Sequence, residues 1–146
     1  MELKIKKLND NAIIPKAATG GSAGMDLYAC LDSDVVLKPG ERALIPTGIA
    51  IALPDSSYVA YIYARSGLAI KNGITLSNCV GVVDSDYRGE IKVGLVNLSD
   101  KDYTVTSGDR IAQMVIAPVI IPEISEVDEL DETERGAGGF GSTGKK

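Results

Sequence analysis

A carboxylate and a tyrosine between two expected strands offer the clearest candidate chemistry. Apolar Val82 and Val83 are followed at once by Asp84, which places a carboxylate at a strand end where a hairpin begins. A carboxylate there could hold and deprotonate a water molecule. The alternative is structural, because Asp84–Asp86 could form an Asx-type turn with Arg88 as its counter-ion. This segment alone leaves both interpretations open.

A second group of residues is suited to anion binding. Arg65, Ser66 and Gly67 stand where a strand gives way to the one short helix that we expect, Ser66–Lys71, which Asn72-Gly73 should end. The unpaired N–H groups of a helix N-terminus attract phosphate, and a guanidinium strengthens the attraction. Ordinary capping by the Ser66 hydroxyl is the competing explanation. Gln113, in an apolar segment, needs partners for a buried amide, either backbone groups or a phosphate oxygen.

The chain contains no histidine, and its formal net charge is −5, with 20 acidic and 15 basic residues. Ser-His-Asp and Cys-His catalysis and histidine-ligated metals are therefore excluded, so carboxylates must do the acid–base work, with oxygen-bound Mg²⁺ as the most suitable metal. Asp26, in a glycine-rich approach to a strand, is weak evidence by itself. The acidic balance argues against nucleic acid or an anionic membrane as the main partner.

The C-terminal segment from Arg135 onward is rich in glycine and contains the only phenylalanine, Phe140. Each residue that becomes ordered costs roughly 1–2 kcal/mol of conformational entropy, so closure of this segment needs a compensating ligand. Backbone N–H groups, hydroxyl groups and one guanidinium could surround a polyanion while Phe140 covers a flat ring. The segment could be a lid over a nucleotide. Taken alone, it is more typical of a solvated terminus.

The 146 residues predict one all-β domain. Short β-branched segments recur about every ten residues between turn residues, which is typical of an antiparallel sandwich or barrel. Alternation of apolar and polar residues predicts one buried face for each of Leu3–Leu8, Tyr58–Tyr63 and Glu90–Val96. Continuous apolar runs predict burial on both faces for Ala43–Leu53 and Ile111–Ile121.

The apolar run Met114–Ile121 contains Pro118 and precedes Pro122, and proline lacks a ladder donor, so we expect an edge strand. We expect a partner subunit to cover this strand, and the alternative is a monomer that covers it with its own loops. The acidic segment Glu123–Glu134 would then connect that strand to the lid. Two similar segments, Val35–Arg42 and Thr104–Arg110, are expected to be hairpins closed by a tight Gly-acid-Arg turn with a local ion pair.

Cys30 and Cys79 show no metal-ligand spacing, so we expect two reduced thiols, with Cys79 contributing to packing. The N-terminal residues lack the apolar core of a signal peptide, and no apolar run is long enough to span a membrane. These features predict a cytoplasmic protein.

Five segments, taken in order, resemble the five motifs of the trimeric dUTPases, and they span nearly the whole chain. They are Ala23–Tyr28, Arg65–Leu68, Gly81–Gly89, Gly108–Met114 and Arg135–Gly144. The resemblance implies a jelly-roll-like β homotrimer with active sites between subunits, in which residues 1–134 form the β domain and residues 135–146 a swapped, flexible lid. The implied reaction is hydrolysis of dUTP to dUMP and pyrophosphate with Mg²⁺, which limits uracil incorporation into DNA and supplies dUMP for dTMP synthesis.

The resemblance also implies roles for individual residues. Asp84 matches the carboxylate that orients and deprotonates the attacking water, and Tyr87 matches the ring under the deoxyribose. Asn78 matches an amide that reads uracil, and Gly81 lies on the hairpin whose backbone pairs with the base. Asp26 matches the acidic residue that touches the water shell of the metal.

The remaining implied contacts are made to the triphosphate and by the lid. The phosphate contacts are Arg65, Ser66, Gly67 and Gln113. The lid residues, which hold the γ-phosphate and cover uracil, are Arg135, Phe140, Gly141 and Ser142.

Two rival functions belong to different classes. A related dCTP deaminase would need a proton shuttle beside the pyrimidine amine, and the Gly73–Val83 hairpin has no acidic residue to provide one. A non-catalytic trimeric binding module would leave Asp84, Arg65 and the Phe140 tail as coincidences.

Overall fold

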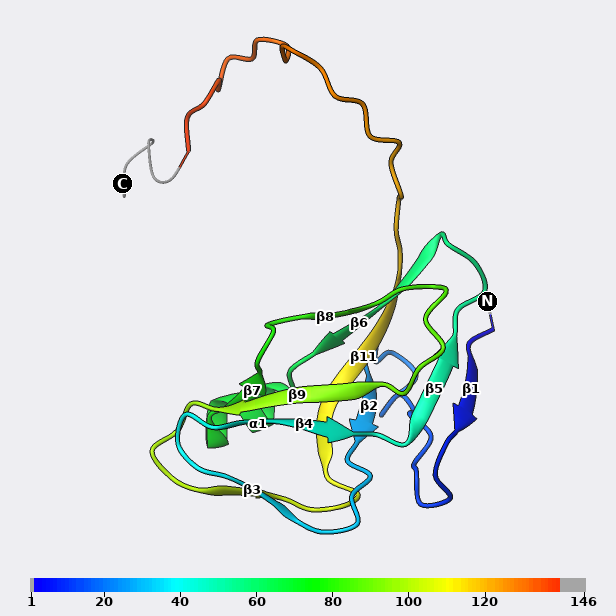
Figure 1. Cartoon of the computed structure of the whole chain (residues 1–146), viewed down its shortest axis with the longest axis vertical. Coiled ribbons are helices and arrows are strands. Elements are labelled where there is room, and N and C mark those ends of the chain that lie inside the picture. Colours follow the sequence, from blue (N-terminus) through cyan, green and yellow to red (C-terminus); the bar gives the residue numbers. More distant parts are fainter. Residues whose placement is uncertain (1, 140–146) are drawn as a thin grey trace.

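The structure is a computed structural model that describes residues 2–139. In this part of the chain, strands dominate and one short helix, α1 (Ser66–Asn72), interrupts them (Figure 1). The strands are β1 (Lys4–Lys7), β2 (Met25–Tyr28), β3 (Val35–Leu37), β4 (Arg42–Pro46), β5 (Ile49–Ala52), β6 (Tyr58–Tyr63), β7 (Ile74–Leu76), β8 (Gly81–Val83), β9 (Lys92–Asn97), β10 (Tyr103–Val105) and β11 (Arg110–Pro118). The expectation of an all-β fold with one short helix is confirmed.

The strands pair antiparallel in four sheets. The largest has the order β2-β11-β6-β8, another has the order β4-β9-β7, and β1-β5 and β3-β10 are two-stranded ribbons. Buried side chains from both larger sheets, including Leu27 and Met114 on one and Val93 and Leu95 on the other, form a single apolar cluster. The fold is therefore a β-sandwich, which fits the expected jelly-roll-like architecture.

Strand β9 shows why the sequence folds into such layers. Its residues alternate between exposed or half-buried and fully buried, as a period of two requires for a strand with one face on a core. In β4 and β5 the expectation of burial on both faces holds for Ile45 and for Thr47–Ile51, but Pro46 is half-buried and Leu44 is 64% exposed. Leu44 instead lines the pocket described below.

The edge-strand prediction for Met114–Ile121 is confirmed for Val115–Pro118, which pair with β6 alone among the described residues. It is wrong for Met114, which pairs with both β2 and β6, and for Val119–Ile121, which lie in no strand. Arg110 and Ala112 pair with β2 alone, Gln113 and Met114 pair on both sides, and Val115–Pro118 pair with β6 alone. Pro118 is the last residue of the strand, where a missing N–H costs no interior ladder bond. Burial on both faces is also wrong beyond this point, since Ile120 is 88% exposed.

The two similar segments form matching turns but not hairpins. In each, the acidic side chain accepts the N–H of the residue three positions earlier: Glu41 that of Lys38 at 2.9 Å, and Asp109 that of Thr106 at 2.8 Å. The strands that precede the turns, β3 and β10, pair with each other, while the strands that follow pair elsewhere. The tight turns are confirmed, and the hairpins and local ion pairs are wrong.

Helix α1 ends as expected, at Gly73 with a left-handed φ of 67°. Arg65 is the residue immediately before the helix, and no side chain caps the N-terminus of the helix. Ser66 is therefore the first helical residue, and the capping interpretation of its hydroxyl is wrong. Within the described residues, α1 lacks the length needed to cross a membrane.

Cys30 and Cys79 are both free thiols, as expected. Cys30 belongs to the core, but Cys79 is exposed in the turn before β8 with a φ of 63°, so its expected packing role is wrong.

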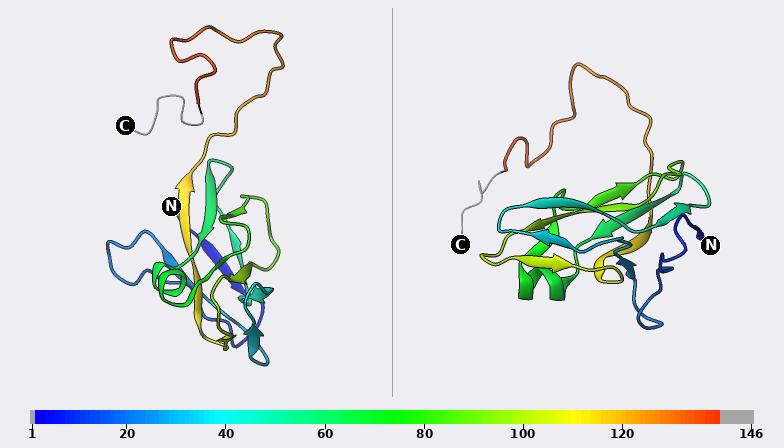
Figure 2. Two further views of the ribbon diagram at one scale, coloured as in Figure 1. Left: turned by 90° about the vertical axis from the view of Figure 1, so that its left-hand side faces the viewer. Right: turned by 60° about the horizontal axis from the view of Figure 1, so that its bottom comes forward.

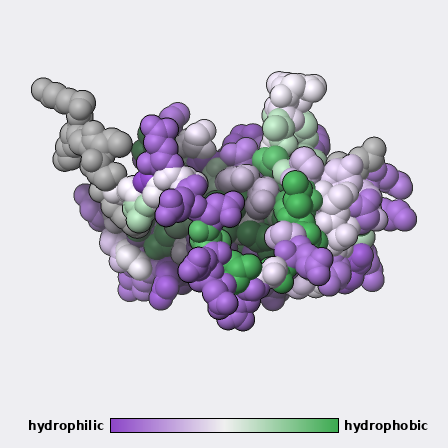
Figure 3. Space-filling view, turned by 90° about the horizontal axis from the view of Figure 1, so that it is seen from above, coloured by the Kyte–Doolittle hydropathy of each residue, from purple (hydrophilic) through white to green (hydrophobic). Residues whose placement is uncertain are grey.

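After Pro118 the chain leaves the sandwich, and residues 119–139 contain no strand or helix (Figures 1 and 2). This connector arches away from the domain and leaves Ile124 and Leu130 about nine-tenths exposed, at 91% and 88%. The view from above shows apolar side chains exposed in the middle of a largely hydrophilic surface (Figure 3).

Candidate active site

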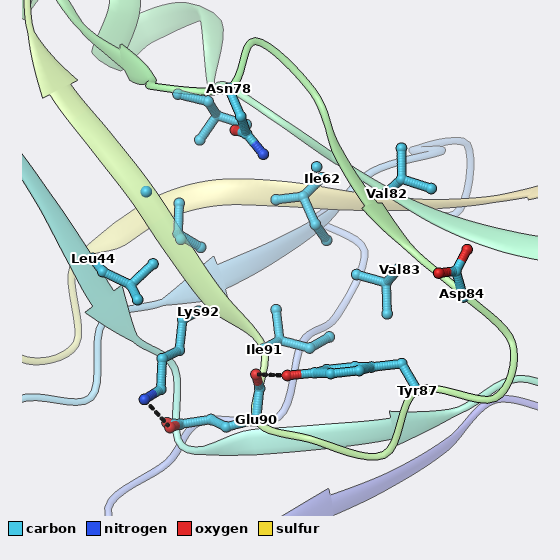
Figure 4. A pocket seen from close by; sticks show the side chains of 14 residues that line it. Leu44, Ile62, Asn78, Val82, Val83, Asp84, Tyr87, Glu90, Ile91 and Lys92 are labelled. Carbon is cyan, nitrogen blue, oxygen red and sulfur yellow. Dashed lines mark hydrogen bonds and ion pairs between the residues drawn. The ribbon is translucent and has the colours of Figure 1, made fainter.

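A pocket of about 470 Å³ opens between β8, the β8–β9 loop and β9 (Figure 4). Four of the site residues expected from the sequence line it: Asn78, Gly81, Asp84 and Tyr87. Apolar side chains make up much of the remaining lining, from Leu44, Ile62, Leu76, Val82, Val83, Ile91 and Val93. The pocket thus combines an apolar body with a few polar groups, as is typical of sites for small organic ligands.

Asp84 directly follows β8 and lies at the rim of this pocket, on the side opposite Lys92 (Figure 4). The residue is exposed and forms no ion pair among residues 2–139. Arg88 does not act as its counter-ion, because its Nη1 donates to the carbonyl oxygens of Ser85 at 2.7 Å and Tyr87 at 2.9 Å. The Asp84 carboxylate is therefore accessible to a water molecule and a ligand.

The Tyr87 ring forms one wall of the pocket and is held at both ends. Its backbone N–H donates to the Asp84 carbonyl at 3.2 Å, and its hydroxyl donates to the Glu90 carbonyl at 3.0 Å. The ring passes so close to Gly89 that a Cβ there would overlap the Tyr87 hydroxyl. The absence of a side chain at Gly89 therefore allows the ring its position.

Glu90 fixes the end of the β8–β9 loop. Its Oε1 accepts the Gly48 N–H at 2.9 Å, and its Oε2 lies 3.5 Å from the Lys92 ammonium. The residue whose carbonyl holds the Tyr87 hydroxyl is thus tied to a neighbouring corner of the fold. This connection anchors the Glu90 backbone that accepts the Tyr87 hydroxyl, while the ring itself is held only through its hydroxyl and its own backbone.

The other end of the pocket is formed by the turn between β7 and β8. Asn78 is exposed in that turn, and Gly81 opens β8 opposite Ile62. A Cβ on Gly81 would lie 3.0 Å from the Ile62 Cβ, so glycine lets the two strands approach closely. The Asn78 amide and the β8 backbone therefore face the same space, where they could read the edge of a flat polar ring.

A separate group of polar residues lies on the other side of β6 from β8, where β11 and β2 continue the sheet. Asp26 on β2 pairs with Gln113 on β11, and Gln113 pairs with Tyr63 on β6, so the three form a row across the sheet. Arg65 follows β6 by two residues and turns back to this row, where its Nε donates to Asp26 Oδ1 at 2.8 Å. We call Asp26, Arg65, Arg110 and Gln113 the arginine cluster.

Gln113 is half-buried, less than expected, and its amide Nε2 donates to the Ala64 carbonyl at 2.9 Å. Gly24 leaves room for the Gln113 side-chain oxygen, which a Cβ there would overlap. Ser66 and Gly67 are exposed in the first turn of α1, next to Arg65. The expected anion-binding residues are therefore adjacent.

Sequence reasoning missed Arg110, whose Nη1 lies 3.2 Å from Asp26 Oδ2. The Arg110 carbonyl also accepts a hydrogen bond from Arg65 Nη1 at 3.1 Å. The Asp26 carboxylate thus binds two guanidiniums while its side chain is only 16% exposed. The chain separation of 84 residues between Asp26 and Arg110 left no local signal for this contact.

Tyr103 on β10 is influenced by this cluster. Burial raises the pKa of its hydroxyl above the ordinary value of 10.0, the negative charge of Asp109 raises the pKa further, and Arg65 opposes both.

The pocket and the arginine cluster are distinct places on one subunit, because none of Asp26, Arg65, Ser66 and Gln113 lines the pocket. Arg135 belongs to neither, since it lies in the connector, where its Nε donates to the Gly138 carbonyl at 2.8 Å. The expected lid residues Phe140, Gly141 and Ser142 lie outside the described residues.

No group of three or more acidic or cysteine side chains within residues 2–139 is placed to hold a metal ion. Asp26 lies beside the expected phosphate-binding residues, and both of its oxygens already accept a hydrogen bond from an arginine. Each carboxylate oxygen can accept a further bond, so Asp26 retains room for metal-bound water.

Comparisons with known proteins agree on one family. The family model named dUTPase matches residues 10–144. A deoxyuridine 5'-triphosphate nucleotidohydrolase of Hydrogenobaculum sp. is 55% identical over 146 residues, which is all of both chains. The dUTPase of Staphylococcus bacteriophage 80alpha, solved with dUPNHPP, superimposes with a TM-score of 0.88 at 30% identity over 98% of both chains. A variant of the phage phi11 dUTPase, which coordinates a structural Mg(II) ion, has a TM-score of 0.81 at 26% identity over 90% of this chain and all of that one.

Proposed function

The chain belongs to the dUTPase family, and on this premise we propose that it is a dUTP diphosphatase in which Asp84 activates the attacking water. The observation that carries the assignment of residues is the pocket that brings Asn78, Gly81, Asp84 and Tyr87 together. Hydrolysis of dUTP yields dUMP, the precursor for dTMP synthesis, and limits incorporation of uracil into DNA.

The reaction consumes one water and releases pyrophosphate. The Asp84 carboxylate accepts a proton from the water while the water oxygen bonds to the α-phosphorus of dUTP. The bond from the α-phosphorus to the oxygen that bridges it to the β-phosphorus then breaks, and that oxygen leaves with pyrophosphate. Because the chain has no histidine, an accessible carboxylate is the available base. Its exposure at the pocket rim leaves space for the water.

The pocket walls explain the expected choice of substrate. A deoxyribose packed on the Tyr87 ring would force a ribose 2′-hydroxyl out of water without a partner, which disfavours UTP. The Asn78 amide and the β8 backbone would match the donor and acceptor pattern of uracil, and the exocyclic amine of cytosine reverses that pattern at one position. The close approach of Gly81 to Ile62 narrows this end of the pocket, which disfavours the methyl group of thymine.

Arg65, Ser66, Gly67 and Gln113 would hold the triphosphate, with Arg135 on the γ-phosphate. Mg²⁺ bound to the substrate phosphates would neutralise charge on them, and Asp26 would contact its water shell. A metal carried mainly by the substrate fits a chain in which, within the described residues, no group of three or more acidic or cysteine side chains is placed to hold a metal ion. The Arg65 guanidinium is then the main protein charge that orients the phosphates.

The separation of pocket and arginine cluster supports a site shared between subunits of a homotrimer. One subunit would supply the pocket and a neighbour the arginine cluster. The connector, which arches away from its own domain, would carry residues 135–146 to a neighbouring subunit as a lid, with Phe140 over uracil and Gly141 and Ser142 on the phosphates (Figure 1). The exposed apolar side chains in Figure 3 suit burial in such an assembly. The two free thiols suit a cytoplasmic enzyme.

The test is pyrophosphate release from dUTP, UTP, dCTP and dTTP by the wild type, Asp84→Asn and Asp86→Asn. We expect the wild type to turn over dUTP alone, and Asp84→Asn to lose about 10²- to 10⁴-fold in kcat while its affinity for dUPNHPP changes little. Asp86 is exposed and does not line the pocket, so its variant is the matched control and should resemble the wild type.

Ammonia release from dCTP would identify a deaminase instead. Wild-type protein that binds dUPNHPP but releases no pyrophosphate from dUTP would identify a binding module. Equal activity of Asp84→Asn and the wild type would remove Asp84 from the mechanism.

A further inference from the structure

Arg110 is the one member of the arginine cluster without a role in the proposed function. Its Nη1 lies 3.2 Å from Asp26 Oδ2, while the other oxygen of the same carboxylate binds Arg65 Nε at 2.8 Å. The Arg110 side chain is 52% exposed, that of Arg65 25%, and that of Asp26 16%. The carboxylate therefore lies between a well-covered guanidinium on one side and a more accessible one on the other.

A β-bulge places Arg110 on this face of the sheet. Gln113 pairs with Asp26 and Ala112 with Leu27, but Arg110 pairs with Tyr28, so Ile111 is the extra residue. In a regular ladder Ile111 would lie opposite Tyr28, on the face of Asp26 and Gln113, and Arg110 would point to the other face. The bulge instead lets Ile111, 2% exposed, stay in the core while Arg110 reaches Asp26.

The matching turn at the end of β3 shows that the turn itself does not require this ion pair. Arg42 follows Gly40-Glu41 as Arg110 follows Gly108-Asp109, and both turns make the same backbone and carboxylate hydrogen bonds. Arg42 forms no ion pair among residues 2–139. The contact of Arg110 with Asp26 is thus specific to the second turn, where the arginine cluster lies.

The contacts of Arg65 show what the ion pair would accomplish. Its Nε is used by Asp26 and its Nη1 by the Arg110 carbonyl, so Nη2 keeps its N–H groups for a ligand. The Asp26 carboxylate can orient Arg65 only if it is itself fixed, and Arg110 binds the second oxygen of that carboxylate. Two guanidiniums and one carboxylate leave the cluster positive, which favours a polyanion.

We infer that Arg110 is a positioning residue that acts through Asp26: it fixes the carboxylate that aims the Arg65 guanidinium at the phosphates of the substrate. This inference rests on the proposed function, because it assigns Arg65 to the triphosphate. It predicts that Arg110 affects the binding of the phosphates and does not affect the binding of the uracil and deoxyribose, which the proposed function places in the separate pocket.

The experiment compares Arg110→Gln, Arg110→Lys and, as the matched control, Arg42→Gln. For each variant the Kd values of dUPNHPP and dUMP, KM and kcat for dUTP, and the melting temperature are measured. We expect Arg110→Gln to weaken dUPNHPP binding about tenfold, with dUMP binding within about twofold of the wild type. Arg110→Lys should keep most of the wild-type affinity for dUPNHPP, since an ammonium still binds the carboxylate. Arg42→Gln should bind dUPNHPP like the wild type.

A double-mutant cycle with Asp26→Asn separates action through Asp26 from direct contact with the ligand. If Arg110 acts through Asp26, then Arg110→Gln should weaken dUPNHPP binding by less than about twofold when Asp26 is already Asn. A full tenfold loss in that background would overturn the inference, as would equal weakening of dUMP and dUPNHPP, or an Arg110→Gln variant that binds both like the wild type. Failure of the proposed function would look different, because the wild type itself would then release no pyrophosphate from dUTP.

Discussion

At the scale of single residues, the position of the Tyr87 ring depends on the missing side chain of Gly89. The ring crosses this glycine and is held by its hydroxyl on the Glu90 carbonyl at 3.0 Å. A methyl group at position 89 would push aside the ring, because the ring is the movable partner. Choice of sugar should therefore be more sensitive to this position than folding is.

We predict that Gly89→Ala lowers the preference for dUTP over UTP, measured as the ratio of kcat/KM values, by about tenfold. Gly20→Ala is the matched control, since a Cβ at Gly20 would meet no atom within 4 Å. An unchanged ratio in Gly89→Ala, with a melting temperature close to that of the wild type, would show that the ring does not select the sugar.

The residues of the pocket could be predicted from the sequence because they are near one another in it. Asn78, Gly81, Asp84 and Tyr87 fall within one strand and its flanking turns, so the resemblance to the dUTPase motifs, together with their closeness in the sequence, brings them together. The ion pair of Arg110 could not be predicted, because it depends on the bulge at Ile111 and on a carboxylate from a distant strand. A turn that is equally well formed around Arg42 gave no hint of the difference.

At the scale of elements, the ribbon of β3 and β10 carries Tyr103 against the domain near Asp109 and Arg65. Burial, and next the charge of Asp109, raise the pKa of Tyr103 above 10.0. The folded protein therefore holds this proton more tightly than the unfolded chain does. The stabilisation is fully present below the pKa of the unfolded chain and is lost as pH rises through the higher pKa of the folded state.

We predict that the free energy of unfolding of the wild type falls more steeply than that of Tyr103→Phe as pH rises above about 10. Urea unfolding at several pH values from 8 to 11, followed by circular dichroism, measures this difference. Parallel curves over the whole range would show that the Tyr103 hydroxyl titrates as it does in the unfolded chain.

The elements themselves were predictable where an alternation of apolar and polar residues defined a strand, as in β9, or a glycine ended a helix, as after α1. Strand β11 was harder, since Pro118 and Pro122 indicated an edge, which holds for Val115–Pro118 but not for Met114. The ends of β2 and β6 decide which residues of β11 have two partners, and the β11 sequence does not encode where those two strands end.

At the scale of the whole molecule, a site divided between subunits has a measurable signature. Asp84→Asn damages the pocket, and Arg65→Ala damages the arginine cluster, so each variant alone should be nearly inactive. In mixed trimers of the proposed assembly, a pocket from an Arg65→Ala subunit would meet an arginine cluster from an Asp84→Asn subunit, and both parts of that site would be intact.

We predict that co-expression of the two variants restores about a quarter of the wild-type activity when subunits mix at random. Mixing the separately purified proteins without unfolding them serves as the control and should restore little. If the co-expressed pair stays as inactive as either variant, pocket and cluster work within one chain.

The pocket and the arginine cluster are separate within one chain, and this separation has a consequence for when a newly made chain becomes active. If the site is shared, a newly synthesised chain is inactive until it has assembled with other subunits. Hydrolysis of dUTP would then begin with assembly and not with folding. A mutant subunit would also inactivate each active site to which it contributes either the pocket or the arginine cluster. A mutant allele expressed beside the wild type would therefore have a dominant-negative effect.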